Sequence, residues 1–322
     1  MSREDMLTFL GEDWTAVQRI IADALRSDVG LLNIVNAEIL SHGGKMLRPM
    51  VTLLMAGACG EINEDSQLYA AASELLHNAT LLHDDVADES DTRRGMPTMR
   101  SRLGPSRAVL LGDFWLAKSV GVILKAKTSD VVRSIFSRTL SDLAEGEMLQ
   151  LEKSGTADTS VKDYLRIIHC KTASLFETAG LSGALSAGAP KSYVDAAGEY
   201  ARALGTAFQI KDDILDYAGD GSLGKPVGID LLEKKITLPL LCAMEGSPRE
   251  KEIRKAVLQI DSHRENYEEI SKFVAEREGV RKAGEVLNEY VESAVKALET
   301  LPQSRYTYYL AEIARYNSVR TK

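Results

Sequence analysis

The chain has 322 residues, of which 44% are hydrophobic and 27% are charged, a composition typical of globular proteins rather than membrane proteins. Acidic residues outnumber basic residues by 47 to 39, and the net charge of −8 argues against a general nucleic-acid binder, whose surface would be basic. The three cysteines lie far apart without CxxC spacing, which indicates neither a zinc site nor a disulfide framework and favours a reduced, cytoplasmic location.

The helical period runs through almost the whole sequence. Apolar residues recur at steps of three and four, and alternating strand patterns are not evident, which predicts an all-α fold. Pro49 and Pro239 stand where helices are expected to begin, and the glycines of residues 219–230 predict a loop. No linker or charge block divides the chain, so residues 1–322 are predicted to form a single domain. No apolar run approaches about 18 residues, and the N-terminus is acidic, so we expect neither a membrane span nor a secretory signal.

The first informative element is a helix expected near residues 66–89. One side of it is apolar, through Leu68, Leu75, Leu82 and Val86. Another side carries a polar stripe at helical spacing, through Ser73, His77, Thr80, Asp84 and Asp88. Such a stripe is ordinarily a solvated face. Here it ends in LLHDDVAD, where Asp84, Asp85 and Asp88 repel one another within about one turn, which favours a bound cation.

A second helix repeats this arrangement in FQIKDDILD, with Asp212, Asp213 and Asp216. Gln209 precedes them at helical spacing and extends the polar stripe. Two such helices facing each other would line a cavity with six carboxylates. Because oxygen ligands of this kind suit Mg²⁺, whose coordination is completed by phosphates and water, the implied substrate is a diphosphate.

An anionic substrate also requires cations near the carboxylates. Basic residues occur in suggestive contexts: GGKMLRP opens a helix, DTRRGMPT follows the first aspartate group, and LGKP lies in the glycine-rich segment. Each alone is ordinarily surface charge. The combined set of candidates is Lys45, Arg48, Arg93, Arg94, Lys171, Lys225 and Lys235.

Taken in order, the motifs from about Gly43 to Pro239 resemble those of the trans-isoprenyl diphosphate synthases, or polyprenyl synthetases. They include GGKMLRP, HNATLLHDDVADESDTRRGMPT, GDFWLAK, HCKTASLF, FQIKDDILDYAGD and GKPVGIDLLEKKITLPL. The resemblance implies a prenyltransferase with an isoprenoid-synthase-type fold, a single large helical bundle around a central cavity. It also implies two substrates, isopentenyl diphosphate and an allylic diphosphate primer, and a homodimer.

The resemblance assigns roles to individual positions. Asp84, Asp88 and Asp212 resemble direct ligands of three Mg²⁺ ions, whereas Asp85, Asp213 and Asp216 act through water or as support. The expected isopentenyl diphosphate site consists of Lys45, Arg48, His77 and Arg94. The expected allylic diphosphate site consists of Arg93, Lys171, Lys225 and Lys235. Lys171, Thr172 and Gln209 would flank the developing carbocation. Lys235 departs from the family pattern, because Lys234 stands where the family often has glycine. Arg320 resembles a residue that closes over the substrate and is left outside the core set.

The implied reaction begins when cations stabilise the departing diphosphate, so that the allylic carbon–oxygen bond ionises. The alkene of isopentenyl diphosphate attacks the resulting cation, and proton loss restores a trans allylic diphosphate one unit longer. Residues four and five before Asp84 lie about 6 to 7.5 Å up the helix. Family members with short products tend to carry an aromatic residue there, so the small Ala79 and Thr80 predict a long-chain product. The helix with Phe114 and Trp115 could supply the tunnel floor.

Two alternatives remain open. A class I terpene cyclase also uses DDxxD and magnesium, although it would normally replace the second aspartate group and would not need a second diphosphate site. A non-catalytic subunit that regulates another prenyl synthase would be expected to show eroded aspartate groups, whereas both groups are complete here.

Overall fold

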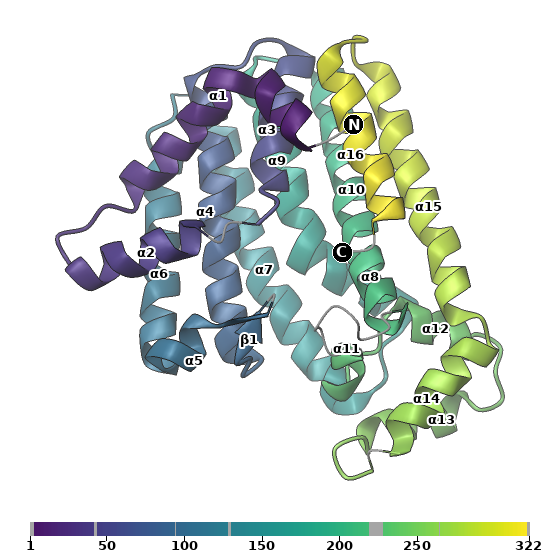
Figure 1. Ribbon diagram of the computed structural model, residues 1–322. Helices are drawn as coiled ribbons and strands as arrows, with labels where there is room; N and C mark the ends of the chain where they lie inside the picture. The colour runs from purple at the N-terminus through teal and green to yellow at the C-terminus, as the bar shows by residue number, and fades with distance from the viewer. Residues whose placement is uncertain are drawn as a thin grey trace. The chain divides into compact units, whose positions relative to one another are not determined.

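The computed structural model describes residues 3–41, 44–93, 95–127, 130–218, 228–263 and 265–320. These residues are helical almost throughout, apart from one very short strand pair (Figure 1), so the predicted all-α class is confirmed. The chain contacts divide into two compact units. Unit 1 comprises Met1–Arg138, Leu175–Ala201 and Ala297–Glu312, and unit 2 comprises Thr139–Ser174, Arg202–Lys296 and Ile313–Lys322. The single domain and its central cavity stay predictions.

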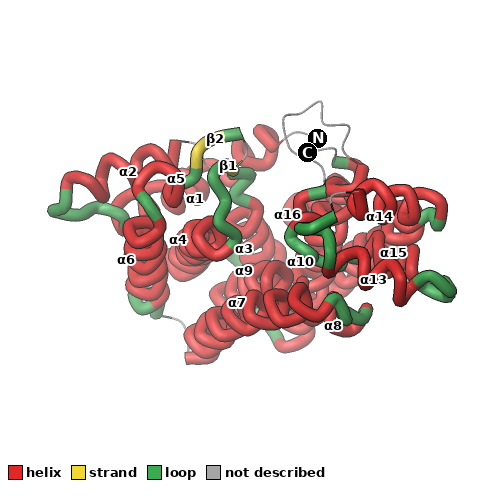
Figure 2. The backbone as a smooth tube through the Cα atoms, turned by 90° about the horizontal axis from the view of Figure 1, so that it is seen from below, coloured by secondary structure: helices red, strands yellow, loops and turns green. Residues whose placement is uncertain are grey.

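Unit 1 is organised around one central helix. Its elements are α1 (Arg3–Ala24), α2 (Gly30–Ser41), α3 (Leu47–Cys59), α4 (Glu64–Ala87), β1 (Thr92–Arg93), β2 (Met96–Pro97), α5 (Met99–Leu103), α6 (Pro105–Ile123), α9 (Ser174–Ser186), the 3-10 turn η2 (Leu298–Thr300) and parts of α7 (Asp130–Thr156), α10 (Lys191–Ala218) and α16 (Arg305–Val319). Figure 2 shows α4 between α6, α3 and α1, against which it packs. The core therefore surrounds the helix that carries the first aspartate group.

The ends of α4 are defined by its sequence. The Asn63 side chain accepts a hydrogen bond from the Ser66 N–H, and the Ser66 hydroxyl accepts one from the Asn63 N–H, which forms a capping box. Leu75 is fully buried and Leu82 is nearly so, as expected of the apolar side. Where α6 crosses α4, a Cβ atom at Gly112 would lie 2.3 Å from the His83 ring, so a side chain there would force this ring to move.

Unit 2 contains the remaining elements. They are α8 (Val161–Ile168), the π-helical turn η1 (His169–Ala173), α11 (Ile229–Leu232), α12 (Leu238–Met244), α13 (Glu250–Leu258), α14 (Glu265–Glu276), α15 (Gly279–Ala297) and the remaining parts of α7, α10 and α16. The turn η1 interrupts an otherwise continuous helical run between α8 and α9, and single π-turns of this kind often occur at functional sites.

Both expected helix starts occur in the structure, whereas the expected loop is described only in part. Pro49 lies in the first turn of α3 and Pro239 lies in the first turn of α12, as predicted. Of the expected loop at residues 219–230, residues 219–227 lie outside the described part, and Ile229 begins the short helix α11, where a loop was expected. Within the described ranges, none of the helices is both long and apolar enough to cross a membrane.

Candidate functional site

The first aspartate group lies at the C-terminal end of α4 in unit 1. Asp84 and Asp85 belong to the last turn, whereas Asp88 caps the helix, with its N–H donating to the Asp84 carbonyl at 2.8 Å. The helix thus ends slightly earlier than the sequence predicted. Asp84 and Asp88 are half-buried, and Asp85 is only 5% exposed. One helical turn therefore presents two accessible carboxylates beside a buried one.

Asp85 is held by the strand pair that follows α4. Arg93 pairs with Met96 across β1 and β2, and its Nε donates to Asp85 Oδ1 at 2.7 Å. Burial raises the pKa of Asp85, while the Arg93 guanidinium acts in the opposite direction and Asp88 adds to the rise. Arg93, expected to hold the allylic diphosphate, here neutralises a buried carboxylate and fixes the segment after α4.

The other predicted basic residues of unit 1 surround the start of α3. Lys45 is exposed just before this helix, and Arg48 is buried in its first turn. The Arg48 guanidinium carbon lies 4.4 Å from the centroid of the Phe176 ring, a cation–π contact that fixes the direction of the side chain. Arg94 lies outside the described residues.

The proposed chain-length residues lie one turn before the aspartates on α4. Ala79 is 1% exposed and Thr80 is half-buried, with its hydroxyl donating to the His77 carbonyl at 2.8 Å. His77 is also half-buried. Because the Ala79 side chain points into the interior of unit 1, a larger residue there would change the interior rather than the surface.

The second aspartate group lies near the end of α10 in unit 2, on the helix that the sequence predicted. Asp213 is 2% exposed and accepts two hydrogen bonds, from the Tyr164 hydroxyl at 2.6 Å and from Gln209 Nε2 at 2.9 Å. Burial raises the pKa of Asp213 to about 7, because the two donors only partly compensate for lost hydration and the carboxylates of Asp212 and Asp216 add to the rise.

Asp216 fastens the segment that contains α11. Its carboxylate accepts the backbone N–H groups of Ile229 at 3.2 Å and Asp230 at 3.1 Å. Burial raises the pKa of Asp216 and, more strongly, that of Asp230, whose carboxyl also faces Asp213 and Asp216. Asp230 was not among the predicted site residues. It extends the acidic cluster of unit 2 beyond the DDxxD motif.

The turn η1 brings two predicted catalytic residues beside α7 and α10. The Thr172 hydroxyl donates to Gln209 Oε1 at 2.7 Å, so Thr172, Gln209 and Asp213 form one hydrogen-bonded chain. Lys171 Nζ lies 2.6 Å from Glu147 Oε1 and 3.1 Å from Gln150 Oε1, both on α7. Gln209 is thus held from both sides by Thr172 and Asp213, whereas Lys171 is held by two side chains of α7.

Close approach of α7 to this turn depends on Gly146. A Cβ atom there would lie 2.7 Å from the Cys170 Cβ and 3.1 Å from the Lys171 backbone nitrogen. Any larger residue would displace the turn or the helix, because such short contacts do not occur between real side chains. Gly146 is therefore a structural requirement for the position of Lys171.

The remaining predicted cations of unit 2 are Lys235 and Lys225. Lys235 is largely buried and forms an ion pair with Glu233. Lys225 lies outside the described residues. Arg320, which was left out of the predicted core set, forms an ion pair with Asp212, with 2.8 Å between a guanidinium nitrogen and Oδ1.

Sequence reasoning missed several groups that contact the predicted residues, namely Tyr164, Glu147, Gln150 and Asp230. Glu147 and Gln150 lie three residues apart in EGEMLQ, a helical spacing that could have drawn attention to them. Tyr164 has no such signal, because its role depends on the meeting of α8 and α10.

The donor set suits a hard divalent cation, since every predicted ligand is a carboxylate. Within the described ranges, no three acidic, histidine or cysteine side chains converge closely enough to hold a metal ion by themselves. Mg²⁺ does not require such a cage, because it is usually held by one or two carboxylates, substrate phosphates and water. The two aspartate groups belong to different units, so their meeting across one cavity stays a prediction.

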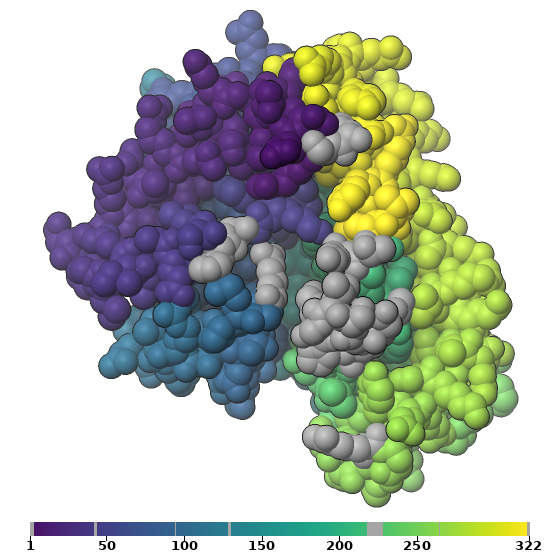
Figure 3. All heavy atoms as spheres, in the orientation of Figure 1, coloured from purple at the N-terminus to yellow at the C-terminus, as the bar shows by residue number. Residues whose placement is uncertain are grey.

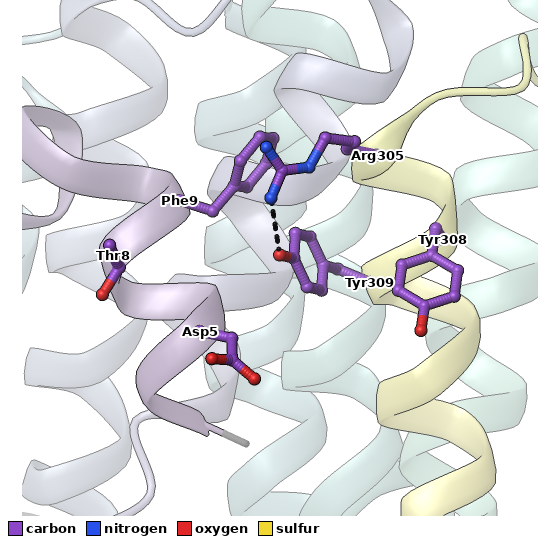
Figure 4. Close-up of a pocket in the computed structure, with 6 residues that line it drawn as sticks. All are labelled: Asp5, Thr8, Phe9, Arg305, Tyr308 and Tyr309. Atoms are coloured by element: carbon purple, nitrogen blue, oxygen red, sulfur yellow. Dashed lines mark hydrogen bonds between the residues drawn. The ribbon is translucent and has the colours of Figure 1, made fainter. Parts of the chain in front are cut away.

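A separate pocket lies on unit 1 between α1 and the beginning of α16. Figure 3 shows these two segments side by side on the surface, in dark purple and yellow. Figure 4 shows the Arg305 guanidinium beside the rings of Phe9 and Tyr309, with a hydrogen bond of 3.1 Å to the Tyr309 hydroxyl. Asp5, Thr8 and Tyr308 complete the lining. None of the predicted site residues lines this pocket.

Comparison with known proteins covers almost the whole chain. A family model described as polyprenyl synthetase matches residues 30–276. The chain is 38% identical over 317 residues to the all-trans-nonaprenyl-diphosphate synthase (geranyl-diphosphate specific) of Rhodobacter capsulatus, covering 97% of this chain and 96% of the relative. It is 37% identical over 316 residues to the octaprenyl diphosphate synthase of Haemophilus influenzae, covering 98% and 96%.

The fold of this chain is also similar to that of a solved structure of a polyprenyl synthase. The crystal structure of a polyprenyl synthase from Caulobacter crescentus CB15, complexed with calcium and isoprenyl diphosphate, has a TM-score of 0.92 and 34% sequence identity to this chain. The match covers 100% of this chain and 98% of the relative.

Proposed function

Because this chain belongs to the polyprenyl synthetase family, and is thus a prenyltransferase, we propose that it is a long-chain trans-polyprenyl diphosphate synthase. It adds isopentenyl diphosphate units head to tail to an allylic diphosphate primer. The names of the nonaprenyl and octaprenyl relatives support a long product. The observation that carries the proposal is the presence of two complete aspartate groups, each at the end of a long helix and each joined to an arginine, Arg93 in unit 1 and Arg320 in unit 2.

We propose that the carboxylates hold three Mg²⁺ ions together with the diphosphate. Asp84, Asp88 and Asp212 would be the direct ligands, because their side chains are more accessible than those of Asp85 and Asp213. The calcium and isoprenyl diphosphate in the Caulobacter crescentus relative support a divalent cation beside a diphosphate. When bound, the metal neutralises the diphosphate and makes it a better leaving group.

The basic residues provide the remaining positive charge. Lys45, Arg48, His77 and Arg94 are proposed to hold isopentenyl diphosphate, and Arg93, Lys171, Lys225 and Lys235 to hold the allylic diphosphate. Lys171 is restrained by Glu147 and Gln150 before any substrate binds. Preorganised charge of this kind stabilises the departing diphosphate without reorganisation during the reaction.

The oxygen atoms of Thr172 and Gln209 are proposed to face the developing allylic cation. Gln209 donates to Asp213, and its Oε1 accepts from Thr172, so the amide has a defined orientation. A fixed amide and hydroxyl provide partial negative charge near the cation without a nucleophile that would trap it. The buried Asp213 thus acts on the reaction through Gln209.

A homodimer and a cytoplasmic location are part of the proposal. Leu110 on α6 and Leu124, which caps the C-terminal end of this helix, are 67% and 62% exposed, and exposed apolar residues at helical spacing favour a protein partner. The three cysteines are free, which fits a reducing compartment. Light scattering of the wild type and of Leu110→Lys tests the dimer, and an unchanged mass in the variant would remove this face from the interface.

The catalytic proposal is tested with purified protein, Mg²⁺, labelled isopentenyl diphosphate and a series of allylic primers, followed by product sizing. Asp84→Ala and Asp212→Ala should each abolish turnover while circular dichroism stays unchanged. Asp195→Ala is a matched control, because this aspartate is exposed on α10 and pairs with Lys191. Near-normal rates in either site variant would remove that aspartate from the metal site, and a cyclised hydrocarbon formed from the primer alone would instead indicate a cyclase.

A further inference from the structure

The last described turn of the chain places one buried arginine against the second aspartate group. The Arg320 side chain is 4% exposed, although only two residues follow it in the sequence. Its guanidinium carbon lies 4.2 Å from the centroid of the Phe208 ring, and a guanidinium nitrogen donates to the Phe208 carbonyl at 2.9 Å. Its Nε donates to Asn317 Oδ1 at 2.8 Å. These contacts hold the Arg320 side chain in one position and shield it from solvent.

The backbone next to Arg320 is fixed in the same way. Lys211 Nζ on α10 donates to the Ser318 carbonyl at 3.0 Å, and the Arg320 N–H donates to the Tyr316 carbonyl at 3.0 Å. The backbone at the end of α16 is therefore joined to α10 by the Lys211 bond, beside the Asp212 contact. This arrangement holds Ser318 and Arg320 against the part of α10 that carries Asp212.

The three aspartates of the second group differ in the charge of their partners. Asp213 accepts from a hydroxyl and an amide, and Asp216 accepts from two backbone N–H groups, all of which are neutral donors. Asp212 pairs instead with the Arg320 guanidinium at 2.8 Å. A full positive charge thus lies at the carboxylate that is proposed to bind metal directly.

We propose that Arg320 is a built-in counter-ion for Asp212, and that a divalent cation must displace its guanidinium from this carboxylate in order to bind. The inference rests on the proposed function, because it requires Asp212 to be a metal ligand. Arg320 is a positioning residue in this role. It stabilises the metal-free state, so that metal loading competes with the ion pair between Arg320 and Asp212.

Electrostatics supports competition rather than sharing. The guanidinium and a divalent cation repel each other, and both would occupy the oxygen side of one carboxylate. The Asp212 side chain is 44% exposed, so a hydrated cation can approach from solvent, and the ion pair is partly screened. One guanidinium nitrogen contacts both Asp212 Oδ1 and the Phe208 carbonyl, so this nitrogen must turn when a cation takes its place. The stacking on Phe208 and the bond from Nε to Asn317 involve other atoms and can hold the rest of the side chain in position.

Metal affinity gives the first test. Mn²⁺ binding to the metal-free full chain, followed by electron paramagnetic resonance without substrate, should be about 3- to 10-fold tighter in Arg320→Gln, the range expected for loss of a partly exposed ion pair. Arg320→Lys should stay close to wild type, because it keeps the charge. Arg315→Gln is the matched control, since Arg315 is exposed on the same helix.

The outcomes separate this inference from the proposed function. Unchanged or weaker Mn²⁺ binding in Arg320→Gln, with binding lost in Asp212→Ala, would overturn the counter-ion role and leave the metal site in place. Mn²⁺ binding that persists undiminished in Asp212→Ala would instead reject Asp212 as a ligand, and with it the premise.

Thermal unfolding distinguishes the proposed role from a merely structural one. Arg320→Gln should unfold at a lower temperature than wild type without metal, and the difference should shrink when both proteins are saturated with Mg²⁺ and inorganic pyrophosphate, because the guanidinium has then left Asp212 in the wild type. A difference that stays the same in both conditions would show that Arg320 only anchors α16, and would overturn the inference.

Discussion

Replacing Ala79 by phenylalanine is the sharpest test of how the chain sets product length. Ala79 lies five residues before Asp84, about 7.5 Å along the axis of α4, which corresponds to about one or two isoprene units beyond the diphosphate end. The side chain is 1% exposed, so the added ring must enter the interior of unit 1. There it meets either a hydrocarbon tunnel or packed side chains.

The two environments predict different results. In a tunnel, the ring fills empty space, and Ala79→Phe should fold normally and release products much shorter than those of the wild type. In a packed core, the ring forces neighbouring side chains and backbone apart at a cost of about 1–3 kcal/mol of unfolding free energy, without a specific effect on product length. Product length and stability measured together therefore decide between them.

The assay uses labelled isopentenyl diphosphate, dephosphorylation of the products and chromatographic sizing, with urea unfolding measured on the same preparations. Ala275→Phe is the matched control, because Ala275 is exposed on α14 and should change neither quantity. A folded Ala79→Phe enzyme whose products keep the wild-type length would refute the tunnel assignment, and so would a variant whose only change is lower stability.

Three further predictions concern unit 2. Tyr164→Phe removes a hydrogen-bond donor to the Asp213 carboxylate and should lower the unfolding free energy by about 1.5–3 kcal/mol at a pH above the pKa of Asp213. Tyr200→Phe, the control, removes a donor to the neutral Leu310 carbonyl and should lower it by only about 0.5–1.5 kcal/mol. Equal losses in urea titrations would contradict this prediction. Gly146→Ala should reduce turnover, because the added Cβ would lie 2.7 Å from the Cys170 Cβ in the π-helical turn. Gly155→Ala on the same helix is the control, since its Cβ would meet nothing within 4 Å and the enzyme should stay active. A normal rate in Gly146→Ala would contradict the close approach. Burial raises the pKa of Asp213 from 3.8 to about 7, so the folded state binds the proton more tightly than the unfolded state does. The metal-free protein should therefore lose stability as the pH rises between these two values. In Asp213→Asn, denaturant titrations should show a smaller dependence of stability on pH.

The long helices and the acidic motifs could be predicted from the sequence, because they depend on the spacing of residues within one segment. The period of apolar residues predicted α4 and α10, and the helical spacing placed the first and last aspartates of each group on one side of the helix. Pro49 and Pro239 marked helix starts for the same local reason. Helix boundaries were predicted less accurately. Asp88 caps α4 instead of continuing it, and Ile229 begins a short helix where a loop was expected.

The partners of the predicted residues could not be read in this way, because they come from elements distant in the sequence. Asp213 and Tyr164 are separated by 49 positions, and Arg320 and Phe208 by 112. Nothing in the local pattern around Tyr164 distinguishes it from ordinary helix residues, and the spacing of Glu147 and Gln150 does not say which residue they contact. Only the packing of α7, α8 and the end of α16 against α10 and its neighbouring turn gives them a function.

The spacing within DDxxD has a physical reason that the two units share. Residues i and i+4 of a helix lie on one stripe, whereas residue i+1 is rotated by about 100° toward the interior. The second aspartate of each group is accordingly the buried one, with Asp85 at 5% and Asp213 at 2% exposure, and each is held by side-chain hydrogen bonds. The motif therefore combines two tasks on one turn. The middle carboxylate fastens the helix end to its surroundings, and this leaves the first aspartate of each pair, Asp84 or Asp212, at a fixed position where it can accept a cation.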